Sequence, residues 1–492
     1  MNATAFIMIG LTLLGVLSPL LTFTALFQLK EWRLDRLIEH LRREGWINQL
    51  FGRIRPVLAL LFFFVKDPLY WLLPFAMLTA AQWILGRQRK PVWTSKAKLL
   101  VILSIALTTL ITFIAPLTPL IILLQPLFVL FAWLLFHPLD TLLKHHIFKQ
   151  ARDLREAHPE WIVIGIAGSV GKTTTKELLA HLLQDVHPLA TPAHVNTEMG
   201  VAKWLVAVSG KRLATSTSIL IVEMGAYRKG EIALMCQFVQ PTIGIVTALG
   251  SDHLALFGSE AAIIEANGEL LESLPKNGKA FLSSDNEGCR ILATRHPNSI
   301  IVPQAENIKE DEFGLHFSLT AYRYSLPLHG LHNINNAALA ITVARHLGIT
   351  DNRIAELLKN FHPLAHTFNV REENGITLVD DTYNSSRLSL RAAIDWAAGR
   401  SERPRILLTS GLMEVGKAED RLMHEIGTHA KGKIERVIFT TASGLRAFEE
   451  GFGGKTELLT SNEQRATKGS LLLAIGRMPL SAIQQLLPTV SP

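Results

Sequence analysis

The chain contains little cysteine and no large excess of either charge. Cys236 and Cys289 are its two cysteines, and neither belongs to a metal-ligand pattern, so the sequence excludes a disulfide framework and a zinc site and indicates a reducing compartment. The formal net charge is +7, and no run of lysine or arginine is interleaved with aromatic residues. We therefore expect no nucleic-acid partner and attribute the charge to basic loops beside a membrane. The sequence specifies no oligomeric state.

The hydrophobic residues are distributed unevenly along the chain. They make up 48% of its 492 residues, and the mean hydropathy of +0.25 is high for a soluble protein. Most of the excess precedes Asp153, whereas the remainder has the composition of an ordinary α/β protein. Length alone suggests about three domains. We predict a membrane-anchoring helical domain at residues 1–153, followed by two α/β domains at residues 156–363 and 364–492.

Four apolar stretches lie in the N-terminal part. Residues 4–27 are long enough for a helix that crosses a bilayer, which takes about 20 residues, and they lack the basic start and the small-residue cleavage site of a signal peptide. We therefore expect an uncleaved anchor. Residues 99–116 and 120–136 are separated by a few residues around Pro116 and Pro119, and this spacing predicts a tight helical hairpin.

The fourth stretch, residues 57–85, is harder to interpret. It is interrupted by Lys66-Asp67-Pro68, and a charge in the middle of a membrane costs about 2.5–3.5 kcal/mol. Basic residues flank the stretch on both sides, and the positive-inside rule places both flanks in the cytoplasm. A single crossing would put them on opposite sides. We favour a re-entrant or interfacial helical pair, and the alternative is one ordinary span with one loop that breaks the rule.

The last apolar stretch is also followed by basic residues, namely Lys144, Lys149 and Arg152. By the same rule, everything downstream of them lies in the cytoplasm. The sequence therefore predicts a multi-pass protein of the cytoplasmic (inner) membrane, with membrane lipids around its first domain and its α/β domains in the cytoplasm.

A glycine-rich loop follows the first strand of the α/β part. Residues 161–167 are apolar and rich in Ile and Val, as in a buried parallel strand, and residues 176–184 have the leucine spacing of a helix. The loop between them has the short pattern G-x-x-G-K-T. In this context its amides and the helix N-terminus would bind phosphate, Lys172 would neutralise charge, and the Thr173 hydroxyl would ligate Mg²⁺. The expected phosphate-binding residues are Gly168, Ser169, Gly171, Lys172, Thr173 and Thr174.

Further motifs follow in a definite order. They are Thr191-Pro192-Ala193-His194-Val195-Asn196-Thr197-Glu198-Met199-Gly200, Glu223-Met224-Gly225-Ala226, Gly250-Ser251-Asp252-His253-Leu254, Gly330-Leu331-His332-Asn333-Ile334-Asn335-Asn336, Asp380-Asp381-Thr382-Tyr383-Asn384 and Met413-Glu414-Val415-Gly416. With the glycine loop, this series resembles the Mur ligase superfamily from about residue 155 to the C-terminus, and most closely the members that add D-alanyl-D-alanine. The resemblance implies a P-loop ATPase domain with a mostly parallel sheet, followed by a Rossmann-like C-terminal domain.

The resemblance implies roles for residues that follow two strands. Glu223 and His253 come after the apolar runs 219–222 and 243–248, where parallel sheets bind ligands, and would hold a second Mg²⁺ with Thr173 nearby. Lys172, Glu223 and His253 would then be the catalytic residues. Without the resemblance, His253 is a hydrogen-bonded loop histidine and Glu223 is a surface carboxylate or a neighbour of a helix N-cap.

The same resemblance implies the remaining contacts with substrates. His332 and Asn333 would contact the adenine of ATP, and Asp381 would bind the ribose. Without it, the first two are a helix cap and Asp381 caps the strand at residues 376–379. The residues on the substrate side would be Asn196, Thr197, Tyr383 and Asn384.

The implied reaction is the activation of a carboxylate. The acceptor carboxylate attacks the γ-phosphate of ATP, and an amine displaces the resulting acyl phosphate, with Lys172 and Mg²⁺ balancing the charge. Peptides or amino acids would be the substrates. Because the membrane segment stands where the family has a domain for a soluble nucleotide-linked precursor, we expect an acceptor that is lipid-linked or otherwise held at the membrane surface.

Three departures from the family pattern bear on activity. Asn267 occupies a position where the family usually has a carbamylated lysine that holds the second metal, and asparagine forms no carbamate. His366-Thr367 replaces a Gly-Arg pair, so an arginine expected near the phosphates is missing. Ser385-Ser386-Arg387 replaces an Asn-Pro pair. The candidates that could restore the lost charge are Arg371 and Arg387.

These departures leave three functions open. The first is an ATP-dependent amide ligase that adds D-alanyl-D-alanine or a similar amine to a cell-wall peptide precursor. The second is a membrane ligase for another amide-linked polymer, such as poly-γ-glutamate. The third is a catalytically weak nucleotide-binding scaffold, which Asn267 and Thr367 favour and which the intact Lys172, Glu223 and His253 oppose.

Overall fold

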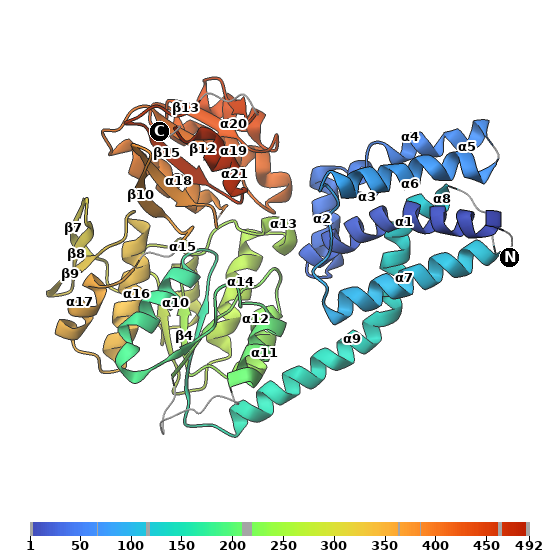
Figure 1. Cartoon of the computed structure of the whole chain (residues 1–492). Helices are drawn as coiled ribbons and strands as arrows, with labels where there is room; N and C mark the ends of the chain where they lie inside the picture. Colours follow the sequence, from blue (N-terminus) through green and yellow to red (C-terminus); the bar gives the residue numbers. More distant parts are fainter. Residues whose placement is uncertain are drawn as a thin grey trace. The chain divides into compact units, whose positions relative to one another are not determined.

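The computed structural model describes residues 3–65, 67–114, 119–208, 219–362, 365–383, 385–460 and 465–488. The chain divides into two compact units, Met1–His145 and His146–Pro492 (Figure 1). Pro363 and Leu364, between which we predicted a domain boundary, lie outside the described residues, and so does the predicted substrate residue Asn384.

The first unit is built from helices. They are α1 (Ala3–Leu29), α2 (Leu34–Glu44), α3 (Trp46–Leu50), α4 (Arg55–Ala59), α5 (Leu61–Phe64), α6 (Pro68–Ile84), α7 (Ser95–Ile114), α8 (Leu120–Leu123) and the first part of α9 (Gln125–Glu156). Phe27 of α1 packs with Leu37 of α2 and Val129 of α9 in one apolar cluster. Many other large apolar side chains are exposed, for example Phe63 at 75% and Ile102 at 62%. Within the described residues, the segments Ile7–Leu29, Ser95–Thr112 and Gln125–Glu156 are long and apolar enough to cross a membrane.

Residues 57–85, apart from Lys66, form a pair of helical arms, and the re-entrant or interfacial placement of this pair stays a prediction. The short helices α4 and α5 pack against α6, and the Asp67 side chain caps α6 by accepting a hydrogen bond from the Leu69 amide at 3.0 Å. The start of α4 is tied to the end of α6, because Arg55 Nη2 donates to Gln82 Oε1 at 3.2 Å. Both ends of the pair therefore lie together, beside Ser18 of α1.

Helices α7 and α9 lie antiparallel. Gln125 Nε2 donates to Thr108 Oγ1 at 3.1 Å near one end of the pair, and the Lys96 ammonium lies 2.8 Å from the Asp140 carboxylate near the other. This is the hairpin predicted from the two apolar stretches, with the short helix α8 added between its arms.

A parallel sheet forms the centre of the second unit. Its order is β2-β3-β1-β4-β5-β6, from β1 (Ile162–Ala167), β2 (Leu189–Ala190), β3 (Ile219–Glu223), β4 (Ile243–Val246), β5 (Lys279–Leu282) and β6 (Ile300–Ile301). Alternate residues of β1 face opposite cores, with Ile164 and Ile166 in one apolar cluster and Val163 and Ala167 in the other. This confirms the mixed α/β fold with a parallel sheet, although β4 ends at Val246 and not at Ala248 as predicted. The reason is that the Ala248 carbonyl accepts hydrogen bonds from the Ser169 and Val170 amides.

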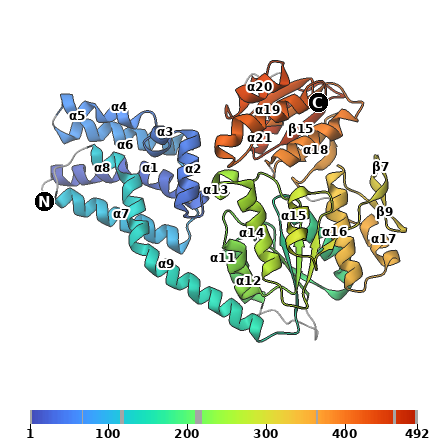
Figure 2. The ribbon, with the colours of Figure 1, turned by 180° about the vertical axis from the view of Figure 1, so that it is seen from behind.

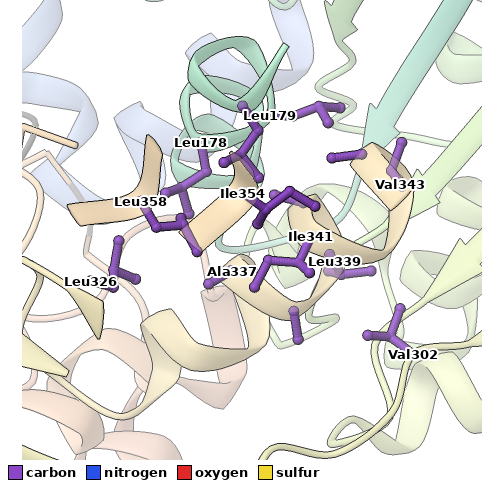
Figure 3. Packing of buried hydrophobic residues seen from close by; sticks show 14 of the residues in the cluster. Leu178, Leu179, Val302, Leu326, Ala337, Leu339, Ile341, Val343, Ile354 and Leu358 are labelled. Carbon is purple, nitrogen blue, oxygen red and sulfur yellow. The ribbon is translucent and has the colours of Figure 1, made fainter. Parts of the chain in front are cut away.

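Helices cover both faces of this first sheet. One face carries α11 (Glu198–Val208), α12 (Glu231–Val239) and α14 (Glu260–Glu272), and the other carries α10 (Lys172–Leu182), α16 (His332–His346) and α17 (Asp351–Lys359) (Figure 2). Leu178, Ile341 and Ile354 meet in the core on the second face (Figure 3). Helix α10 begins at Lys172, four residues before the start we predicted, because Gly171 adopts a φ of +86° and the threonines after it form the first helical turn.

Two further sheets complete the unit. A small antiparallel sheet contains β7 (Glu306–Asp311), β8 (Gly314–Leu319) and β9 (Tyr322–Leu326). The second large sheet has the order β10-β11-β15-β12-β13-β14, and only β10 (Asn369–Glu373) runs antiparallel to its neighbour. Its other strands are β11 (Ile376–Asp381), β12 (Arg405–Thr409), β13 (Arg436–Phe439), β14 (Glu457–Leu458) and β15 (Leu471–Ile475).

The second large sheet is also covered on both faces. Helices α18 (Arg387–Ala398), α19 (Glu419–Ala430) and α20 (Leu445–Phe452) pack on one face, and α21 (Leu480–Leu486) packs on the other. The shorter helices α13 (Leu254–Phe257) and α15 (Glu287–Arg295) follow β4 and β5. The strands predicted at residues 376–379, 406–409, 437–440 and 471–475 are all present, shifted by two residues at most.

Candidate active site

The glycine loop, residues 168–173, joins β1 to α10 in a conformation that only glycine adopts without strain. Gly168 has a φ of +140° and Gly171 a φ of +86°. A Cβ atom on Gly168 would collide with the Thr247 hydroxyl, and one on Gly171 would collide with the Asn336 amide oxygen. The two glycines therefore let the loop pack closely against Thr247 and Asn336 and lead directly into the N-terminus of α10, where helices commonly bind anions.

The Lys172 side chain folds back onto the glycine loop. Its Nζ donates to the carbonyl oxygens of Gly168 at 2.6 Å and Ser169 at 2.9 Å. Burial lowers the pKa of this ammonium, while the charges of Glu223 and Asp252 act in the opposite direction. A phosphate placed on the loop amides would give the ammonium a better partner than two neutral carbonyls.

Glu223 is the last residue of β3, and its carboxylate is surrounded by donors. The Thr173 hydroxyl donates to it at 3.1 Å, and the Asn196 Nδ2 donates at 3.0 Å. The Lys176 ammonium lies 3.4 Å away and is completely buried, and it also donates to the Thr191 carbonyl at 2.9 Å. Asn196, which we expected on the substrate side, is therefore placed against the predicted metal-binding carboxylate.

A small pocket of about 60 Å³ adjoins the glycine loop. Its walls include Lys172, Asn196, Asp252, His253 and Asn267. Of the three predicted catalytic residues, Lys172 and His253 thus line one pocket, and Glu223 touches its Asn196 wall. Asn267 donates its Nδ2 to the Ile263 carbonyl at 2.7 Å, so its carbonyl oxygen is the amide atom left for a ligand.

His253 lies in the loop after β4 with a φ of +56°. Its Nδ1 is 2.6 Å from Glu414 Oε2, which belongs to the loop after β12 of the second sheet. The ring also packs edge-on against Tyr227. Glu414 accepts at one ring nitrogen, and it fixes the orientation of the other nitrogen relative to the pocket.

Asp252 brings a carboxylate to the small pocket. Its Oδ2 atom is buried without a hydrogen-bond partner in the described structure. Burial raises the pKa of this carboxyl, while the charges of His253 and Lys172 act in the opposite direction. Across the described residues, no group of three or more His, Cys, Asp or Glu side chains has the arrangement of a metal site.

The second sheet also contributes Tyr383, just after β11. Its hydroxyl lies 3.3 Å from His194 Nδ1. Burial and the charge of Glu223 raise the pKa of the Tyr383 phenol, whereas Arg477 and a hydrogen bond with Thr173 act in the opposite direction. Tyr383 therefore reaches the Thr173–Glu223 pair from the other sheet.

A larger cavity of about 680 Å³ lies on the other side of the glycine loop. Its walls include Gly171 and Thr174 at the start of α10, His332 of α16, Asp381 at the end of β11 and Trp396 of α18. Burial lowers the pKa of His332 to about 4, so its imidazole is neutral at pH 7. His332, Phe368 and Trp396 follow one another edge to face along the wall.

Glu310 of β7 connects residues that line this cavity with the segment before α16. Its Oε1 accepts from the Trp396 indole at 2.6 Å and from the Gly330 amide at 3.0 Å, and His329 Nδ1 lies 3.0 Å away. Burial alone would raise the pKa of Glu310, but these hydrogen bonds outweigh it and lower the pKa.

Several predicted residues are held by hydrogen bonds or ion pairs within the fold. Thr197 accepts from the Gly200 amide at 3.4 Å at the start of α11, and Asn333 is buried and donates to the His329 carbonyl at 2.8 Å. Arg371 pairs with Glu373 and Asp380, and Arg387 pairs with Glu425. Thr367, where the charge is missing, lines the larger cavity, and neither of these two arginines is among the residues of its wall.

Sequence reasoning assigned no role to Lys176, Glu414 or Asp252. Lys176 follows Lys172 by four residues, which on a helix places both on one face and was a usable signal. Glu414 and Asp252 stood inside motifs that we recognised, but nothing in their spacing indicated that Glu414 would meet His253.

Comparison with known proteins gives a consistent result. Residues 166–344 match the Mur ligase middle domain. The UDP-N-acetylmuramoyl-tripeptide--D-alanyl-D-alanine ligase of Escherichia coli is 31% identical over 363 residues, which cover 67% of this chain and 78% of that protein. The enzyme of the same name from Synechocystis is 32% identical over 275 residues, covering 55% of this chain and 59% of its own length.

Solved structures agree at the level of the fold. MurF from Acinetobacter baumannii has a TM-score of 0.64 at 22% identity and covers 70% of this chain and 80% of its own. MurF from Thermotoga maritima, in complex with ADP, has a TM-score of 0.61 at 24% identity and covers 70% and 82%.

Fold and site together define a nucleotide-binding α/β protein in which a glycine loop, a lysine and a buried carboxylate adjoin one cleft. The chain belongs to the Mur ligase family, a family of ATP-dependent ligases. This confirms the family predicted from the ordered motifs.

Proposed function

We propose that the chain is an amide-bond ligase that adds D-alanyl-D-alanine, or a similar amine, to a cell-wall peptide precursor at the cytoplasmic face of a membrane. One observation carries the proposal. Lys172 and His253 line one pocket, and the Thr173–Glu223 pair adjoins that pocket through Asn196. A cation, a hydroxyl–carboxylate pair and an imidazole are thus gathered where a carboxylate can be phosphorylated.

ATP would extend along the glycine loop between the two cavities. The larger cavity would hold the nucleoside, with His332 and Asp381 in its wall, and the smaller pocket would face the γ-phosphate. A volume of about 680 Å³ lies in the range usual for a cofactor-sized ligand.

The donor set also fits a magnesium ion. Mg²⁺ takes oxygen ligands and is usually held by one or two carboxylates together with substrate phosphates and water. The Thr173 hydroxyl and the Glu223 carboxylate lie within 3.1 Å of each other beside the loop, and they would hold the ion, which would supply positive charge to the phosphates. His253 and Asn267 would face the acceptor carboxylate from the other wall of the small pocket.

The residues of this chain would contribute mainly charge and position. The acceptor carboxylate attacks the γ-phosphorus, ADP leaves, and the amine then displaces phosphate from the acyl phosphate to form the amide. Lys172 balances the charge that develops on the transferred group. Tyr383 and Glu414 come from the second sheet, which we propose to be a Rossmann-like domain that excludes water from the acyl phosphate.

We also propose that the helical unit anchors the protein in the cytoplasmic membrane. Three long apolar helices and their exposed side chains support this. So does the distribution of charge, because contacts such as Gln28 with Val92 and Arg55 with Ser18 gather the basic segments around residues 30–55 and 87–98 at one end of the unit. An acceptor held at the membrane surface is consistent with such an anchor.

The activity is tested with the full chain in detergent or nanodiscs. Phosphate release from Mg·ATP is measured with UDP-muramoyl tripeptide and D-alanyl-D-alanine, together and singly, and with Lys172→Ala as the control that abolishes the signal. Release that needs both substrates supports the proposal. Release only with other acceptors and amines indicates a different amide-linked polymer, and nucleotide binding without any turnover indicates a scaffold.

The anchor is tested by cysteine accessibility. Both native cysteines are buried, so a membrane-impermeant maleimide reports mainly on introduced sites. We expect Lys90→Cys, in the basic segment, to be labelled only after the cytoplasmic face is exposed. Release of the protein from membranes by alkaline carbonate would contradict the proposal.

A further inference from the structure

The carboxyl edge of the second large sheet contains an arginine that the reaction has not used so far. Arg477 follows β15 by two residues, and β15 lies between β11 and β12. Strands β11 and β12 lie on opposite sides of β15, so the chain crosses over β15 between them. In open α/β sheets, ligands bind at such a crossover, outside the carboxyl ends of the strands. The Gly476 amide donates to the Asp381 carbonyl at 3.2 Å, so the segment is fixed next to Asp381.

Arg477 is exposed, and no hydrogen bond or ion pair joins it to any part of the chain that the structure describes. This distinguishes it from the other arginines near the cleft. Arg371 and Arg387 are held in ion pairs, and Arg400 lies over the Trp396 ring and pairs with Glu402. Arg477 is therefore a cation that remains available to an external anion.

Arg477 lies beside the segment from Asp381 to Tyr383, because the Gly476 amide is bonded to the Asp381 carbonyl. Its charge acts on the phenol of Tyr383, whose hydroxyl meets His194 Nδ1 at 3.3 Å. Tyr383 in turn reaches Thr173 and Glu223, where the acyl phosphate would form. The pocket that contains Lys172, by contrast, has no residue of the second sheet in its wall.

The class of ligand that Arg477 would bind follows from the charges of the substrates and from the length of a dipeptide. The phosphates of ATP already have Lys172 and the loop amides, whereas an amino acid or dipeptide that donates its amine carries a carboxylate with no assigned cation. An extended dipeptide spans at most about 7 Å from its amine to its carboxylate, which is comparable with the length of an arginine side chain. The planar guanidinium matches a carboxylate with two parallel hydrogen bonds.

We propose that Arg477 binds the carboxylate of the incoming amine substrate and so restricts the enzyme to amino acids or peptides with a free C-terminus. Gly476 makes this placement possible. It has a φ of +105°, and a Cβ atom there would lie 2.5 Å from the Ser410 hydroxyl and 3.2 Å from that of Ser385. The inference rests on the proposed function, since it assigns the amine side of the same site.

The test compares each amine with its C-terminal amide. Binding of D-alanyl-D-alanine and of D-alanyl-D-alaninamide is measured by calorimetry on the full chain, loaded with Mg²⁺ and a non-hydrolysable ATP analogue. We expect the wild type to bind the acid about 10- to 100-fold more tightly than the amide, and Arg477→Gln to bind both equally weakly. Arg477→Lys should recover part of the preference, because it restores a point charge without the planar fork.

Arg446 provides the matched control. It is an exposed arginine after β13, two strands further along the same edge, and Arg446→Gln should keep the full preference for the acid. Because Arg477 is exposed, its replacement should not impair folding.

Two results would overturn the inference. One is a wild type that binds acid and amide equally. The other is an Arg477→Gln variant that still prefers the acid, and if this variant also binds the ATP analogue more weakly, Arg477 is assigned to the phosphates. Turnover is measured separately, so the acid preference can be present even if ligation by the wild type fails, and the two proposals are tested independently.

Discussion

The two large sheets carry different kinds of polar residue at their carboxyl edges. In the first sheet, Glu223 and Lys176 are almost completely buried and are bonded to neighbours of the same sheet. In the second sheet, Tyr383 and Glu414 each contact a residue on the first-sheet side, while Trp396 of α18 contacts Glu310 of the small antiparallel sheet. The first sheet therefore contains a preformed charge arrangement, and the second completes it with single side chains. Changes in the first should affect folding, and changes in the second should affect binding and rate.

The largest effect is expected at Lys176. Replacing it by Met leaves the buried Glu223 carboxylate without its ammonium partner, and breaking a buried pair in this way costs about 3–5 kcal/mol. Urea unfolding of the full chain in detergent, followed through the α/β transition, measures the loss. Lys203, exposed on α11, is the control, and Lys203→Met should change the stability by less than about 0.5 kcal/mol. Equal midpoints for the two variants would contradict a preformed site in the first sheet.

A smaller effect, on rate rather than folding, is expected at Glu414. Glu414→Ala removes the acceptor at His253 Nδ1 and should lower kcat/KM by about 10- to 100-fold, the usual size for a charge-assisted hydrogen bond. Steady-state phosphate release measures it, and the melting temperature should hardly change. Glu414→Gln keeps an acceptor without the charge and should be intermediate. If alanine and glutamine variants both behaved like the wild type, the contact between the sheets would have no role in the reaction.

Trp396 of α18 tests a different contact, with Glu310 of the small antiparallel sheet. Trp396→Phe preserves an aromatic ring but removes the indole donor to Glu310, which keeps its bonds to His329 and Gly330. We expect the KM for ATP to rise about fivefold, equivalent to about 1 kcal/mol, with the KM for the amine unchanged. A change in the amine KM instead would show that the larger cavity does not hold the nucleotide.

A further effect depends on pH. His332 has a pKa of about 4 in the folded chain because of burial, against about 6.5 in an unfolded chain. Between these pH values the unfolded state binds more protons than the folded state. The contribution of the neutral His332 to the free energy of unfolding is therefore fully present above pH 6.5. It decreases as the pH falls towards 4, by up to about 1.4 kcal/mol per pH unit. Comparing His332→Asn with the wild type by urea unfolding at several pH values isolates this component.

The exposed His362 is the control for that experiment. His362→Asn should keep the steep slope of the wild type, whereas His332→Asn should flatten it. Parallel curves for His332→Asn and the wild type would contradict the burial of this imidazole in the cavity wall.

Local patterns predicted much of the architecture. The apolar runs predicted β1, β3, β4, β11, β12, β13 and β15 to within two residues but not the other strands, and the glycine loop was placed correctly between β1 and α10. The start of α10 was predicted four residues too late, because nothing in the threonine run indicates that Gly171 turns the chain directly into the helix. Asn196 lines the small pocket, and its substrate role stays a prediction, but its hydrogen bond to Glu223 was not predicted, since a bond between distant segments leaves no periodic signal.

Residue order alone determined the family, the strand–loop–helix that can bind phosphate, and the apolar stretches of the first unit, because each depends on neighbours along the chain. The pairing of His253 with Glu414, the burial of Lys176 against Glu223, and the free guanidinium of Arg477 beside Tyr383 were decided only by tertiary structure. These residues are separated by many positions in sequence, and their energies arise only when two sheets pack and exclude water from the charges between them.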